Sequence, residues 1–126
     1  MHQVAEIMTP TPITMHVEDT LESAWKLMRN HHIRHIPVTR SDRKLVGLVT
    51  HRNLMINTQN INQLTLPVAE IMDSDVVTID AEADLRQAIT LLQEKKIGCL
   101  PVMRDGQLVG MLTSSDFLAL AKRLLG

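Results

Sequence analysis

Two short segments carry polar side chains at a spacing that could bind a ligand. Each ends a hydrophobic run with a threonine, and three residues later comes an acid or an amide: Thr113 with Asp116, and Thr50 with Asn53. Such a pair can form a capping box, in which both side chains bind backbone N–H groups at the start of a helix. A carboxylate also accepts hydrogen bonds from two neighbouring hydroxyls, such as those of a ribose. Asp116 is therefore either a helix cap or a residue that binds the hydroxyls of a sugar.

Two glycines interrupt the hydrophobic runs that lead to these threonines, Gly47 in "LVGLVT" and Gly110 in "LVGMLT". Glycine weakens a strand, and inside a strand it often marks a bulge or the close approach of another group. The helix-cap interpretation does not explain why glycine stands inside these runs. We therefore expect another group to need the space beside each glycine.

The segment "RHIPV" supplies the positive charge that a phosphate group would need. Arg34 can make a forked contact with an anion, and His35 follows it directly. At the equivalent positions of the second half, Gly98 and Cys99 offer no charge. Cations before the Pro-Val dipeptide are therefore expected in the first half only.

The histidines of "HHIRH" have a spacing that also suggests a metal site. No carboxylate or cysteine completes a ligand set there. His31 and His32 align with Lys95 and Lys96 of the second half, and positive charge is favourable at the end of a helix. The sequence thus favours an exposed helix end, and we predict no metal ligand and no catalytic residue.

The whole chain is a duplication, and a repeat has to be found before the elements are assigned. "VAEIM" begins at residue 4 and again at residue 68, an offset of 64 positions, which becomes 63 between Gly47 and Gly110. Each copy has the order β-α-β-β-α, which predicts a mixed α/β (α+β) fold. We assign the first repeat to residues 1–56, a connector to 57–67 and the second repeat to 68–126.

Two amphipathic helices are predicted from apolar residues spaced i, i+3, i+4 and i+7. These residues are Leu21, Ala24, Trp25 and Met28 in the first repeat and Leu85, Ala88, Ile89 and Leu92 in the second. Asp19 with Glu22 is expected to cap the first helix, whereas Ala83 caps the second poorly. Each helix follows a short predicted strand, "ITM" or "VVTI", and Asp105-Gly106 is typical of a hairpin turn.

Composition argues against several classes of partner. The 126 residues are 44% hydrophobic and carry a formal net charge of −1, which gives no basic surface for nucleic acid or for an anionic membrane. The single cysteine cannot form an internal disulfide, and no apolar run has the length of a membrane span or a secretory signal. We expect a cytoplasmic protein. Half of the chain buries too little surface alone, so the repeats should pack together and share a cleft.

The duplicated order, the strands "IPV" and "LPV", and the segments "GLVTHRN" and "GMLTSSD" resemble the CBS domain, and the tandem resembles a CBS pair, or Bateman module. The resemblance extends over nearly the whole chain. It implies two repeats packed with pseudo-twofold symmetry. It also implies a non-catalytic sensor that binds AMP, ADP, ATP or S-adenosylmethionine as a ligand in clefts between the repeats, with no cofactor.

The resemblance further implies which side chains contact the nucleotide. In the main cleft, the base, the ribose and the phosphates would be contacted by Ile13 and Met111, by Thr113 and Asp116, and by Arg34 and His35, respectively. The weaker cleft would use Thr50, Asn53 and Val77. Hydrogen bonds to charged groups contribute about 1.5–3 kcal/mol against about 1 kcal/mol for neutral pairs, and Asn53 is neutral. We expect two unequal sites, with the Asp116 cleft occupied first.

The sequence is compatible with three classes of function. The first is the adenine-nucleotide sensor, expected to be a homodimer that acts on an unidentified regulated protein; a helix predicted at 114–125 offers an apolar stripe for contact. An enzyme is disfavoured because nothing supplies a nucleophile with its base, or positions a metal or water. The third is a dimerisation or protein-interaction module whose pockets stay empty. Stabilisation of the fold by a nucleotide would distinguish the sensor from the interaction module, and product formation would identify an enzyme.

Overall fold

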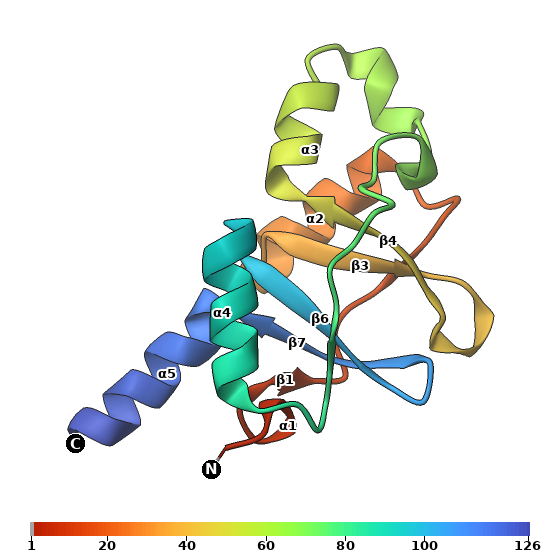
Figure 1. Cartoon of the computed structure of the whole chain (residues 1–126). Coiled ribbons are helices and arrows are strands. Elements are labelled where there is room, and N and C mark those ends of the chain that lie inside the picture. The colour runs from red at the N-terminus through yellow and green to blue at the C-terminus, as the bar shows by residue number, and fades with distance from the viewer. Residues whose placement is uncertain (1) are drawn as a thin grey trace. The chain divides into compact units, whose positions relative to one another are not determined.

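The computed structural model describes residues 2–126 (Figure 1). The chain forms two compact units: one is Ile13–Val76, and the other joins the residues up to Pro12 with Val77–Gly126. Each unit contains one sheet, and in each the repeat runs strand, helix, strand, strand, helix. The predicted mixed α/β fold with a duplicated element order is therefore confirmed.

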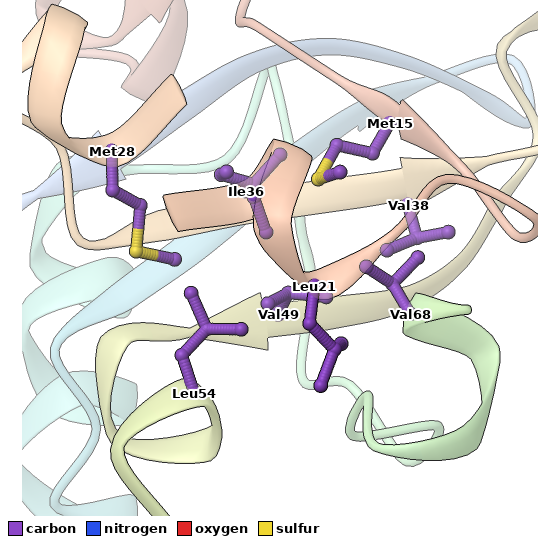
Figure 2. Close-up of a cluster of buried hydrophobic side chains, with 9 residues drawn as sticks. Met15, Leu21, Met28, Ile36, Val38, Val49, Leu54 and Val68 are labelled. Carbon is purple, nitrogen blue, oxygen red and sulfur yellow. The ribbon is translucent and has the colours of Figure 1, made fainter. Parts of the chain in front are cut away.

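The unit Ile13–Val76 is built on a three-stranded sheet of order β2-β3-β4, in which β2 is parallel and β4 antiparallel to β3. Its elements are β2 Met15–His16, α2 Leu21–His31, β3 His35–Thr39, β4 Leu45–Thr50 and α3 His51–Asn57, with 3₁₀ turns η1 Ser41–Arg43, η2 Ile61–Thr65 and η3 Val68–Glu70. Side chains of the strands, α2, α3 and η3 form one core (Figure 2), which includes Met15, Leu21, Ile36, Leu54 and Val68. Burying such a side chain stabilises the fold by about 1.5–3 kcal/mol.

The second unit is built on a four-stranded sheet of order β1-β7-β6-β5. Its elements are α1 Val4–Ile7, β1 Thr9–Pro10, β5 Ile79–Asp80, α4 Leu85–Lys95, β6 Cys99–Arg104, β7 Gln107–Thr113 and α5 Ser114–Leu125. Its core contains fully buried residues from α1, α4 and the strands, among them Val4, Ala88, Leu100, Val102 and Leu112. Each unit thus has a hydrophobic core of its own.

Both amphipathic helices are present, but each N-cap lies one residue after the predicted position. The Thr20 hydroxyl caps α2 by accepting a first-turn N–H at 3.2 Å, so the predicted pair of Asp19 and Glu22 is wrong. The Asp84 carboxylate caps α4 by accepting a first-turn N–H at 2.9 Å. The start of α4 is therefore well capped, which the alignment on Ala83 did not reveal.

The predicted turns are found. Both α2 and α4 end in a residue with left-handed backbone, His32 and Lys96, each with φ of 54°. Both side chains are exposed, which confirms the predicted exposed helix ends. Asp105 and Gly106, with φ of 52° and 78°, close the hairpin between β6 and β7, as a two-residue turn of this type requires.

The first segment of each sequence repeat packs in the unit formed by the other repeat. β1 pairs antiparallel with β7, so that Thr9 lies opposite Met111. Equivalently, Asp73 exchanges two backbone hydrogen bonds of 2.9 Å with Leu48 of β4. The compact units therefore differ from the sequence repeats by the exchange of two segments, residues 2–12 and 68–76.

The exchanged segments explain the two strand glycines. A Cβ at Gly110 would lie 3.0 Å from the Met8 side-chain Cγ, and one at Gly47 would lie 2.9 Å from the Met72 Cγ. Each glycine also adjoins a shift in strand register. The predicted bulge and close approach are both confirmed, and the approaching group is a methionine of the same chain.

We expect Gly110→Ala to lower the free energy of unfolding by about 1–3 kcal/mol, because the added methyl group overlaps Met8 and the adjacent Thr9 backbone. Urea unfolding measures the loss. Adding Met8→Ala to Gly110→Ala should recover part of it, since the flexible partner is then removed. A single variant as stable as the wild type would contradict this account of the glycine.

Candidate functional site

The carboxylate of Asp116 lies at the start of α5, against the exchanged segment. Its Oδ2 accepts the backbone N–H of Thr113 at 2.8 Å, with the Thr113 hydroxyl 3.4 Å away. Its Oδ1 accepts the hydroxyl of Thr9 at 2.7 Å. The helix-cap interpretation is therefore confirmed. A carboxylate has about four acceptor positions, so the half-buried Asp116 can still accept a hydrogen bond from a ligand.

At the equivalent turn, the start of α3, the hydrogen bond between the helix and the exchanged segment runs in the opposite direction. The Oδ1 of Asn53 accepts the Thr50 N–H at 2.8 Å, and its Nδ2 donates to the Asp73 carboxylate at 3.5 Å. Asp73 stands where the other repeat has Thr9. One unit thus carries its carboxylate on the helix, and the other carries it on the exchanged segment. Neither Thr9 nor Asp73 was among the predicted site residues, although each directly follows a methionine of the "VAEIM" repeat.

A pocket of about 500 Å³ lies within the unit Ile13–Val76, where α2 ends and α3 begins. Its polar lining consists of Arg29, Arg34, His32, His51 and Trp25. The Trp25 and His51 rings meet edge to face with centroids 5.2 Å apart, and the Arg34 carbonyl accepts the His51 N–H at 2.9 Å. In residues 2–126, no acidic side chain lines this pocket. Its charge therefore favours an anion.

His35 differs from its neighbour Arg34. It is the first residue of β3, opposite Thr50, and it does not line the pocket. Burial, and to a smaller extent the charge of Arg34, lowers the pKa of His35 below 6.5. The lowered pKa favours the uncharged form of His35 at neutral pH, so the positive charge of this segment comes from Arg34.

The equivalent positions of the second repeat contribute no charge. Gly98 is exposed. Cys99 is buried, and burial raises the pKa of its thiol to about 12. The thiol is therefore protonated at neutral pH and is a poor nucleophile.

The residues expected to contact a nucleotide are divided between the units. Ile13–Val76 contains Ile13, Arg34, His35, Thr50 and Asn53, and the other unit contains Val77, Met111, Thr113 and Asp116. Met111 lies opposite Thr9 in the β1–β7 pair, which brings it near the Asp116 turn. Ile13 and Val77 lie before β2 and β5, which begin at Met15 and Ile79, so the strands start later than predicted.

The part of the chain that the structure describes shows neither a cluster of metal ligands nor a membrane-spanning helix. Among its residues, no three histidine, cysteine, aspartate or glutamate side chains are grouped in a way that could hold a metal ion. None of its helices combines the length and the apolar composition needed to cross a membrane.

Known sequences match both repeats. The CBS domain family matches residues 4–57 and again residues 68–123. A CBS domain-containing protein of Dictyostelium discoideum is 31% identical over 134 residues, which cover 97% of this chain and 92% of the relative. Homoserine O-acetyltransferase of Methanocorpusculum labreanum is 35% identical over 88% of this chain, but the match spans 22% of that enzyme.

Solved structures have the same fold. A Vibrio cholerae protein described as an acetoin utilization protein (AcuB) has a TM-score of 0.93 and 36% identity, with 99% of this chain and 93% of that chain covered. The CBS domain pair of protein MJ0100, solved in complex with 5′-methylthioadenosine and S-adenosyl-L-methionine, has a TM-score of 0.85 and 27% identity, with 97% of each chain covered. Because the family matches twice and these structures match nearly end to end, the chain belongs to the CBS domain family as a tandem pair of CBS domains.

Proposed function

We propose that this CBS pair is a regulatory module that binds an adenine nucleotide or S-adenosylmethionine and catalyses no reaction. The observation that carries the proposal is the half-buried Asp116 carboxylate, which is held at both oxygens and retains acceptor positions suited to the two hydroxyls of a ribose. The similar CBS pair of MJ0100 was solved with 5′-methylthioadenosine and S-adenosyl-L-methionine. Both of those ligands contain adenosine.

In the proposed main site, each part of the nucleotide has its own set of contacts. Thr113 and Asp116 bind the ribose, and Ile13 and Met111 contact the base. Arg34 binds the phosphates, supported by the cationic lining of its pocket. The lowered pKa of His35 favours its uncharged form, so we assign it a hydrogen bond rather than an ion pair.

The second proposed site uses Thr50, Asn53 and Val77 and is weaker. The Asn53 amide oxygen already accepts the Thr50 N–H, so it has less capacity for ribose hydroxyls than a carboxylate. The main site is therefore expected to fill first.

The proposed repeats span residues 1–56 and 68–126, with 57–67 as the connector.

Regulation requires that the ligand binds one state of the module more tightly than another and that a partner distinguishes them. We propose that the module is a homodimer and that α5 contributes to the contact. Three leucines of α5 are exposed, Leu118 by 71%, Leu124 by 74% and Leu125 by 88%. The same leucines favour a second candidate function, a dimerisation or protein-interaction module with empty pockets.

A thermal-shift titration with AMP, ADP, ATP and S-adenosylmethionine tests the proposal. A ligand at about 100 times its dissociation constant adds about 2.7 kcal/mol to the folded state, which corresponds to a shift of several degrees in a domain of this size. GMP serves as the control for the base. If no adenine ligand raises the melting temperature at millimolar concentration, the second candidate is favoured; a rise accompanied by product formation would indicate an enzyme.

A further inference from the structure

The hydrogen bond between Thr9 and Asp116 links the proposed ribose site to an exchanged segment. The Thr9 hydroxyl donates to Asp116 Oδ1 at 2.7 Å, although the two residues are 107 positions apart in the chain. The other carboxylate oxygen accepts the Thr113 N–H at 2.8 Å. Because both oxygens are held, the carboxylate has one fixed orientation and its free acceptor positions have fixed directions.

The rest of the exchanged segment is attached by its backbone and by packing. The Val4 and Ala5 N–H groups donate to the carbonyls of Ala83 and Ala81, each at 2.9 Å, and the Met8 side chain fills the space beside the glycine of β7. Within the described residues 2–12, Thr9 is the side chain that hydrogen-bonds outside the segment. A change in the hydrogen bonding of the Asp116 carboxylate therefore acts on the exchanged segment directly through Thr9.

We propose that Thr9 is a positioning residue of the ribose site: it fixes the Asp116 carboxylate for the ligand, and a bound ligand in turn stabilises the exchanged segment. This inference rests on the proposed function. Without the Thr9 hydroxyl the carboxylate can rotate, so ligand binding would have to restrict that rotation. Coupling is reciprocal: if the Thr9–Asp116 hydrogen bond strengthens ligand binding, ligand binding stabilises that hydrogen bond by the same free energy.

The other repeat offers a matched control. Asp73 occupies the position equivalent to Thr9, but there the helix residue donates and the segment residue accepts, at 3.5 Å. Asp73 therefore does not orient a carboxylate on its helix. Changing it should leave the affinity of the Asp116 site unaltered.

The experiment is a calorimetric titration of the wild type, Thr9→Val, Thr9→Ser and Asp73→Asn with AMP, ATP and S-adenosylmethionine. Thr9→Val keeps the shape of the side chain and removes the donor, so we expect affinity to fall about tenfold, the lower end of what one hydrogen bond to a charged group contributes. Thr9→Ser should restore it, and Asp73→Asn should match the wild type at the tighter site, which is assigned to Asp116. 2′-Deoxy-AMP lacks one of the two ribose hydroxyls that the carboxylate would bind. The affinities of Thr9→Val and the wild type should therefore differ less for this ligand.

Hydrogen exchange supplies a second readout that a purely structural role would not alter. In the wild type, AMP should slow exchange at the amides of Val4, Ala5 and Met8; in Thr9→Val this ligand-dependent protection should be lost. If the wild type binds and Thr9→Val binds equally or more tightly, the positioning role is overturned and the proposed function stands. If the wild type binds none of the three ligands, the proposed function fails and this inference fails with it.

Discussion

Asp116→Ala is expected to remove most of the stabilisation of the protein by its adenine ligand, whereas Asn53→Ala should leave most of it. The carboxylate is the proposed acceptor for both ribose hydroxyls, so its removal should weaken binding about a hundredfold, or about 2.7 kcal/mol. A ligand concentration that stabilises the wild type by about 2.7 kcal/mol would then stabilise the variant by about 0.4 kcal/mol. Melting temperatures with and without ligand measure this difference.

Alanine at this position also removes a helix cap, which costs about 1 kcal/mol of stability in the absence of ligand. Asp116→Asn separates the two effects. An amide oxygen can still accept the Thr113 N–H, as the Asn53 amide does for Thr50 at 2.8 Å, while the charge is lost. We expect Asp116→Asn to melt close to the wild type without ligand and to respond weakly to nucleotide. Loss of the response in Asn53→Ala alone would reverse the assignment of the stronger site.

The fold could be predicted where local patterns repeat. The apolar spacing of α2 and α4 and the hairpin dipeptide at Asp105-Gly106 have short-range physical causes, and they were found as expected. The two strand glycines also marked a close approach, although the methionines that approach them come from the exchanged segments. The segment exchange could not be predicted this way. α1 and β1 are four and two residues long, too short for a periodic pattern, and β1 pairs with a strand about a hundred residues away.

The candidate site was predictable only where one segment supplies the whole contact. Thr113 and Asp116 lie within one turn, so their spacing predicted the cap. Thr9 and Asp73 reach the helix starts only because the exchanged segments return to the sheets, which no local pattern encodes. The uncharged state of His35 likewise depends on burial in the folded unit, which its place beside Arg34 in the sequence does not indicate.

Arg34→Gln should weaken binding of AMP and ATP about ten- to a hundredfold while leaving 5′-methylthioadenosine unaffected. The guanidinium can make charge-assisted contacts of about 1.5–3 kcal/mol with a phosphate, and 5′-methylthioadenosine has none. Arg34 also lines a pocket whose other polar groups include Arg29 and two histidines. Within the described chain no acidic side chain lines this pocket, so no negative charge repels an anion there. Calorimetric titration with the three ligands measures the difference.

The control for this prediction is Arg40→Gln, because Arg40 is exposed and lies outside the pocket. It removes the same charge from the same unit, so it separates a local contact from the effect of net charge. The affinity of the wild type for AMP should also fall with rising salt, and that of 5′-methylthioadenosine should not, because salt screens a partly exposed ion pair and leaves neutral contacts unchanged. If Arg34→Gln weakens both ligands equally, Arg34 shapes the unit as a whole and does not bind phosphate. A loss confined to the phosphorylated ligands would identify Arg34 as a residue that binds the phosphate.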